Sequence, residues 1–222
     1  MRGGRSRFHC LRVPAAAFRD RRTARFRPGG GDAPERGAAA APETTGGHAV
    51  IAVVGHTDLT EGAQEAVREA LRRRLERAPQ GMGALVRAGR GLPQAYGRAA
   101  REAGRPLTVV LPADGTVPAP LPAADRAAAG ELLLLAEQVR LLPYDPADRD
   151  AVVGADERLV GAAGALLAVW DGSPTDGTDA TAHLVAYARA RSVPVEVVWP
   201  AGAARTGRAP RAARRGRPVG TR

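Results

Sequence analysis

The 222-residue chain has room for one domain of ordinary size with flanking segments, and its net charge of +10 is unevenly distributed. Residues 1–47 hold ten Arg against four acids, and residues 201–222 hold seven Arg against none, which leaves a charge of −3 for the middle. The basic balance therefore does not predict a nucleic-acid-binding face on the fold. We expect disordered basic extensions at 1–47 and 201–222 and one folded domain at 48–200.

Cysteine usage and hydropathy narrow the class of protein further. The single cysteine, Cys10, excludes an intramolecular disulfide framework and a cysteine metal site, which favours a reducing, cytoplasmic compartment. No run approaches the ~18 apolar residues that a membrane span needs, and the N-terminal residues lack the apolar segment of a secretory signal. We therefore predict no membrane association, and only weak, non-specific nucleic-acid contact through the Arg-rich extensions.

Strand and helix patterns alternate from His48 onward. Residues 49–54 (AVIAVV) form a continuous apolar run that predicts a strand buried on both faces, and Thr60 is placed to cap a helix that follows. Similar runs predict strands at 84–86, 107–111, 140–142, 165–170 and 193–199, and helices beginning near Pro93, Asp125, Asp145 and Gly177. The alternation predicts an α/β domain with a single Rossmann-like, doubly wound and mainly parallel sheet.

Ligands of such sheets bind beyond the carboxyl ends of the strands, where the strand order reverses. We expect four glycine-bearing loops to gather there, at 55–58, 89–92, 112–115 and 171–178. Three of them lead towards helix N-termini, whose free N–H groups favour phosphate. The chain has no Lys and no complete G-x-G-x-x-G, so a P-loop or a standard dinucleotide fingerprint is not predicted.

The candidate ligand-binding residues lie in these loops because strand-end loops present backbone N–H groups and side chains to one crevice. They are Gly55, His56, Thr57, Asp58, Gly89, Arg90, Gly91, Asp171, Gly172, Gly177 and Thr178. The alternatives are structural: Asp58 and Thr178 as helix caps, and Arg90 as a solvated side chain. No metal site is predicted, because the spacing of His56, Asp58 and Asp171 matches no specific pattern.

The motifs together resemble those of a known superfamily. Val-Val-Gly-His-Thr-Asp-Leu at 53–59, Leu-Pro at 111–112, Leu-Leu-Ala-Val-Trp-Asp-Gly at 166–172 and Gly-Thr at 177–178 resemble the SLOG superfamily, and are closest to uncharacterised actinobacterial members. This group includes the "lonely guy" phosphoribohydrolases and the DNA-processing protein A family. The resemblance implies a nucleotide or nucleotide-derived ligand and leaves a homodimer open. The phosphoribohydrolase motif P-G-G-x-G-T-x-x-E keeps only its Gly-Thr pair here, and Thr181 stands where that motif has its catalytic Glu.

Three functions follow from these residues. The leading hypothesis is a sensor or binding protein for a nucleotide or phosphoribosyl ligand, with no cofactor assigned. The alternative is a nucleoside-monophosphate hydrolase or transferase in which Asp58, Asp171 or Asp179 acts as general acid or base. A second alternative is DNA handling through the Arg-rich extensions.

Overall fold

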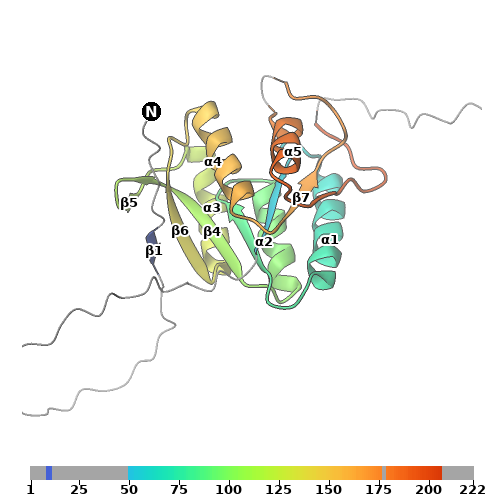
Figure 1. Cartoon of the computed structure of the whole chain (residues 1–222), viewed down its shortest axis with the longest axis horizontal. Helices are drawn as coiled ribbons and strands as arrows, with labels where there is room; N and C mark the ends of the chain where they lie inside the picture. The colour runs from blue at the N-terminus through green and yellow to red at the C-terminus, as the bar shows by residue number, and fades with distance from the viewer. Residues whose placement is uncertain (1–8, 12–49, 177–178, 207–222) are drawn as a thin grey trace, which may run out of the picture.

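The computed structural model describes residues 9–11, 50–176 and 179–206 (Figure 1). The strands are β1 (His9–Leu11), β2 (Val50–Gly55), β3 (Gly83–Arg87), β4 (Leu107–Asp114), β5 (Val117–Pro118), β6 (Gln138–Pro143), β7 (Ala165–Val169) and β8 (Val195–Val197). The helices are α1 (Glu61–Arg77), α2 (Leu92–Glu102), α3 (Ala123–Leu135), α4 (Arg149–Gly161) and α5 (Thr181–Ala190). Among the described residues, no helix has the length and apolar character to cross a membrane.

The sheet has the predicted mainly parallel, doubly wound organisation. Its strand order is β1-β6-β4-β3-β2-β7-β8, in which β6, β4, β3, β2, β7 and β8 run parallel and β1 pairs antiparallel with β6. The chain winds outward from β2 through β3 and β4 to β6, then returns to the other side of β2 with β7. The order therefore reverses between β2 and β7, and the ligand crevice of a doubly wound sheet is expected there.

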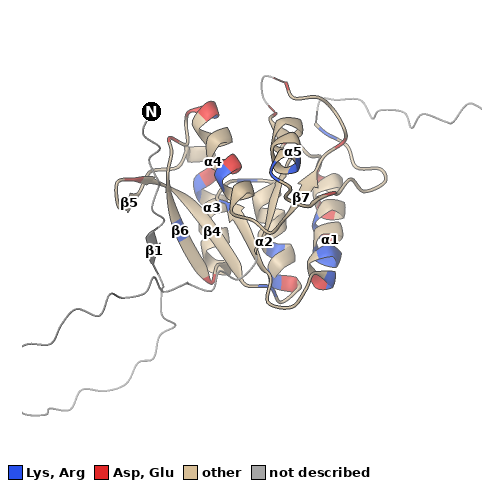
Figure 2. Ribbon diagram, in the orientation of Figure 1, with Lys and Arg blue, Asp and Glu red and all other residues tan. Residues whose placement is uncertain are grey.

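Helices cover both faces of the sheet, which explains why the strands are apolar on both sides. Helices α1, α2 and α3 share one core cluster with β2, β3 and β4, in which Leu71, Leu75, Tyr96 and Leu132 are fully buried. Helix α4 packs over β3 and β2, and α5 packs over β2 and β7 on the other face (Figure 1). Most charged residues lie on the helices and their adjoining loops rather than on the strands (Figure 2). The charge pattern thus leaves the sheet interior to apolar packing.

Several details of the predicted elements are wrong, among them the start of α5, which lies at Thr181 rather than near Gly177. Strand β4 continues to Asp114 and forms a hairpin with β5, because Gly115 takes the left-handed conformation (φ +62°) that the tight turn requires. The 112–115 segment is therefore a hairpin and not one of the loops at the crevice. Helix α4 begins after Asp148, whose side chain accepts the Asp150 N–H, rather than at Asp145. Asp125 lies in the first turn of α3 and does not cap it.

The packed domain reaches beyond the predicted boundary at 200. Residues 201–206 run beside the loop after β2, where Leu59 and Arg205 form an antiparallel bridge and Thr60 N–H donates to Ala204 O at 3.1 Å. Residues 9–11, inside the predicted N-terminal extension, pair with β6 as β1. Disorder of the rest of both extensions remains a prediction that falls outside the described residues.

Candidate functional site

The point where the strand order reverses is occupied by a histidine between two aspartates. His56 follows β2 directly, and Asp171 follows β7, the strand beside it. His56 Nε2 lies 3.0 Å from Asp171 Oδ1, and its Nδ1 contacts Asp179 Oδ2. The ring is 1% exposed and meets the ring of Trp199 edge-on at 5.7 Å between centroids. The sequence-predicted residues at 56, 171 and 179 therefore form one buried cluster.

Local backbone geometry fixes each member of this cluster. Asp171 Oδ1 accepts the Ser173 N–H at 2.8 Å, which closes a turn in which Gly172 has a left-handed φ of +81°. Asp179 Oδ1 accepts the Thr181 N–H at 2.7 Å at the start of α5. When His56 is neutral, Nδ1 donates to Asp179 while Nε2 accepts the Asp171 N–H at 3.2 Å; a protonated ring can donate to both carboxylates.

Arg205 completes the cluster from the C-terminal segment. Its Nε lies 2.8 and 3.0 Å from the two carboxylate oxygens of Asp58, and one Nη lies 3.2 Å from Asp179 Oδ2. The other Nη donates to Ser173 Oγ at 3.3 Å and lies 3.9 Å from Asp171 Oδ2. Only 6% of the Arg205 side chain is exposed, so one buried guanidinium joins three loop carboxylates.

The electrostatics favour the ionised forms of Asp171 and Asp179. Burial by itself would raise the pKa of Asp171, but hydrogen bonds from Ser173 and His56 outweigh it and hold the pKa below its ordinary value. Burial opposes ionisation of Asp179 in the same way, and hydrogen bonds from His56 and Thr181 hold its pKa far below the usual range. Burial would lower the pKa of Arg205, and the neighbouring aspartates raise it instead.

The cluster also has metal-ligand spacing. Donor atoms of His56, Asp58 and Asp179 all lie within 4.8 Å of one another. Arg205 already supplies a positive charge at that position through its contacts with Asp58 and Asp179. The arrangement satisfies the carboxylates without an added cation.

A cavity of about 140 Å³ lies beside the cluster, over the carboxyl ends of β2 and β3 and between α4 and α5. Apolar side chains line much of it, among them Val53, Val86, Leu92, Val152 and Leu184. Its polar lining comes from Thr57, Arg87, Arg149, Asp156, Asp179 and Thr181. A wider, shallow depression of about 540 Å³ adjoins it and shares Arg149, Val153 and Ala180.

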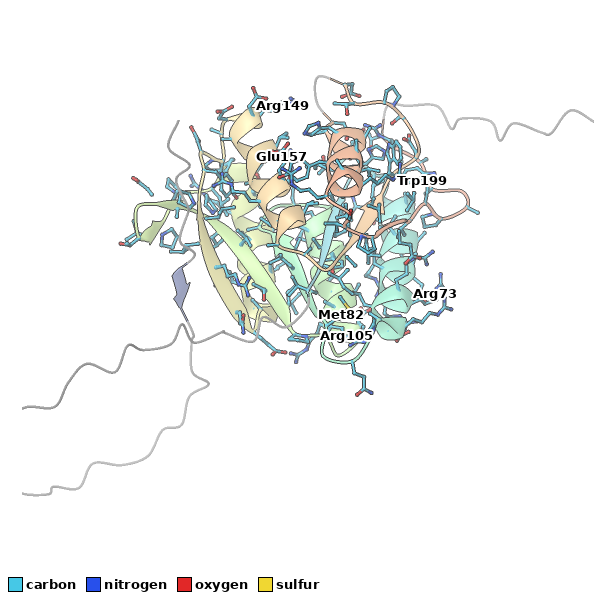
Figure 3. All side chains as sticks on the ribbon, in the orientation of Figure 1. Arg73, Met82, Arg105, Arg149, Glu157 and Trp199 are labelled. Carbon is cyan, nitrogen blue, oxygen red and sulfur yellow. The ribbon has the colours of Figure 1, made fainter. Side chains whose placement is uncertain are left out.

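Two arginines border this cavity, and they differ in exposure to solvent. Arg87 Nε lies 2.7 Å from Asp156 Oδ1, and both side chains are mostly buried. Arg149 is about half exposed at the N-terminal end of α4 (Figure 3), and it donates to the carbonyl oxygen of Asp176 across the mouth at 3.1 Å. Arg149 is thus the more exposed of the two arginines that line the cavity.

The remaining predicted site residues are distributed unevenly around the cavity. Gly55 and Thr57 line it, whereas Arg90 is 71% exposed and faces Asp125 of α3. Gly91 supplies the left-handed φ of +75° from which α2 begins, and Gly89 precedes it in the same loop. Gly177 and Thr178 lie outside the described residues.

Sequence reasoning missed Arg205, Arg87 and Arg149. Arg205 stands among the Gly, Ala and Arg residues of the C-terminal segment, where nothing distinguishes it from its neighbours. The one available signal is indirect: Asp58 and Asp171 at strand ends and Asp179 at a helix start are expected at one edge of a domain with net negative charge, which favours a nearby cation. Arg87 and Arg149 lie outside the glycine-bearing loops that predict phosphate binding, so that pattern does not indicate them.

Fold and site together define a doubly wound α/β protein with a carboxylate–histidine–arginine cluster where its strand order reverses and a partly apolar cavity beside it. No protein-family model matches the chain, and no curated protein is significantly similar to it.

Solved structures with related folds include the molybdenum cofactor carrier protein of Chlamydomonas reinhardtii, with 21% identity and a TM-score of 0.43 over 67% of this chain and 75% of that one. DNA processing protein A of Helicobacter pylori, described with its single-stranded DNA binding mode, has 10% identity and a TM-score of 0.48 over 68% and 65% of the two chains. DNA processing protein A of Streptococcus pneumoniae has 14% identity and a TM-score of 0.49 over 67% and 50%. At these levels of similarity, function has to be inferred from the site itself.

Proposed function

We propose that this protein binds a nucleotide or a phosphoribosyl compound in the cavity between α4 and α5. The observation that carries the proposal is the composition of that cavity: an apolar interior at the carboxyl edge of the sheet, bordered by hydroxyl groups and a half-exposed arginine. Binding sites for small molecules combine apolar walls with a few placed polar groups in this way.

The dimensions suggest how the ligand divides between the two spaces. The inner cavity of about 140 Å³ is below the roughly 300–1,000 Å³ of typical ligand pockets, so it suits one ring of a ligand rather than the whole molecule. The adjoining depression of about 540 Å³ offers room for the remainder. A base or sugar ring is expected inside, with the phosphate outside.

The polar groups fit the two ends of such a ligand. Thr57 and Thr181 line the cavity and carry hydroxyl groups that can hydrogen-bond sugar hydroxyls. Arg149 lines both spaces and is placed to contact a phosphate, which guanidinium groups bind through paired N–H donors. The resemblance of 53–59 and 166–172 to the SLOG superfamily supports the same ligand class.

Binding is favoured over hydrolysis because the candidate acid–base groups are already engaged. Asp58 and Asp179 are ion-paired with Arg205, and Asp171 is hydrogen-bonded to His56 and Ser173. A general base needs a free lone pair directed at the substrate and a pKa near the working pH, whereas the pKa values of Asp171 and Asp179 are lowered.

The test is thermal unfolding of the full chain against nucleoside monophosphates, nucleosides, phosphosugars and divalent ions. A ligand at 100 times its Kd stabilises the folded state by about 2.7 kcal/mol, which corresponds to roughly 5–10 °C for a protein of this size. Val153→Phe, which fills space shared by the two cavities, is expected to abolish the shift. The matched control Val117→Phe changes a 59% exposed residue in β5 and is expected to keep it. A cooperative melt that no compound shifts would refute the proposal.

A further inference from the structure

The C-terminal segment 201–206 lies along the loop that begins the site. Besides the bond from Thr60 N–H to Ala204 O, Thr206 N–H donates to Asp58 O at 2.6 Å, so main-chain bonds flank Arg205 on both sides. The preceding residues are anchored, because Val198 is 1% exposed and Trp199 packs on the core and against His56. We refer to residues 201–206 as the C-terminal strap.

Arg205 links the strap to both loops at the reversal of strand order. Asp58 belongs to the loop after β2, whereas Asp171, Ser173 and Asp179 belong to the segment between β7 and α5. Arg205 contacts all four, and its side chain is 6% exposed. Asp179 is 11% exposed and Asp58 is 41% exposed, so water screens the Arg205–Asp179 pair less than the Arg205–Asp58 pair.

Asp179 connects this strap to the ligand cavity. Asp179 is one of the residues that line the cavity, and its Oδ2 lies 3.2 Å from an Arg205 Nη. An uncompensated carboxylate in the wall would repel a ligand phosphate, and Arg205 offsets that charge from behind. Arg205 itself does not line the cavity.

We propose that Arg205 is a positioning residue that holds the strap against the site and makes the cavity tolerant of an anionic ligand by neutralising Asp179. This inference rests on the proposed binding function. It predicts that the strap increases the affinity for a phosphate-bearing ligand and has little effect on the affinity for the same ligand without its phosphate.

The experiment compares full-length wild type with Arg205→Met, Arg205→Lys and the control Arg73→Met. Arg73 is a half-exposed arginine of α1 (Figure 3) whose removal changes the net charge equally. Affinities are measured for adenosine, guanosine, cytidine and uridine and for their 5′-monophosphates. Hydrogen exchange of the Thr60 and Thr206 amides, without ligand, reports whether the strap is in place.

In Arg205→Met we expect faster exchange at both amides and monophosphate binding weakened on the order of tenfold, as one uncompensated charge near the ligand implies. Nucleoside binding is expected to change less than about twofold. Arg205→Lys should recover most of the monophosphate affinity, and Arg73→Met should resemble wild type.

Two results would overturn the inference. Equal weakening of nucleosides and monophosphates would mean that Arg205 acts only on the shape of the cavity, and unchanged exchange at Thr60 and Thr206 would mean that Arg205 does not hold the strap. If wild type bound neither class, the proposed function would fail and with it the anion role. The exchange measurement would still decide whether Arg205 holds the strap.

Discussion

Asp179→Asn is the substitution that examines the cluster most directly. The asparagine keeps an oxygen for the Thr181 N–H, but its amide replaces the Oδ2 that contacts His56 Nδ1 and Arg205. Hydrogen bonds to charged groups contribute about 1.5–3 kcal/mol each, and His56 and Arg205 retain Asp171 and Asp58 as partners. We therefore expect the free energy of unfolding at pH 7 to fall by roughly 2–4 kcal/mol, or about 5–15 °C in Tm.

The pH dependence of this difference in unfolding free energy is a second test, because its direction follows from the pKa of Asp179. Because the pKa of Asp179 is lower in the folded state than in the unfolded chain, its stabilisation is fully present above the unfolded value near 3.9. It is lost progressively as the pH falls from there towards the folded value. The gap between wild type and Asp179→Asn should thus narrow as the pH falls below about 5.

Urea unfolding of both proteins from pH 8 to pH 3 measures the gap directly. Asp150→Asn serves as the control, because the Asp150 side chain is 90% exposed and its loss should change stability by less than about 0.5 kcal/mol. A gap at pH 7 no larger than that of the control, or one that widens in acid, would contradict the structural reasoning.

Two further substitutions examine how the fold supports the site. In Gly55→Ala the new Cβ would lie 2.4 Å from Val169 O and 2.6 Å from Val169 Cβ, so we expect a loss of about 1–3 kcal/mol by calorimetry; Gly62→Ala, which meets nothing within 4 Å, should be neutral or slightly stabilising. Tyr96→Phe removes the fully buried O–H that donates to Ile51 O at 2.7 Å, and urea titration should show a loss of about 1 kcal/mol. A Tyr96→Phe protein as stable as wild type would mean that the hydrogen bond from Tyr96 to Ile51 O does not stabilise the fold.

The sequence predicts a structural feature correctly when neighbouring residues determine that feature. The buried runs at 49–54 and 165–170 and the cap at Thr60 were readable because a strand covered on both faces and a capped helix follow from neighbouring residues. The start of α4 was misplaced because Asp145 and Asp148 both precede it, and sequence alone does not rank two capping residues. The hairpin at 112–118 is not evident from the sequence because a proline usually indicates the end of a strand. Pro112 instead continues β4, and its carbonyl oxygen accepts a hydrogen bond from Ala119 N–H.

For the candidate site residues, too, the sequence indicates position but not every role. Strand-end position is enough to predict His56, Asp58 and Asp171 as candidates, since parallel strands bring their carboxyl ends to one edge, and Asp179 follows from its place at the start of the last helix. Gly55 was nominated for a ligand, whereas its packing against Val169 gives it a structural reason to be glycine. Its role in binding remains a prediction.

The sequence by itself determined a doubly wound α/β domain and the edge of its sheet at which polar groups meet, because hydrophobic periodicity and strand-end glycines are encoded locally. Only the tertiary structure decided that β2 and β7 are neighbours, that His56 lies between Asp171 and Asp179, and that Arg205 returns to contact them across 147 residues from Asp58. The physical reason is that the partners of an ion pair are determined by which side chains folding brings close together. The spacing of residues along the chain does not contain that information.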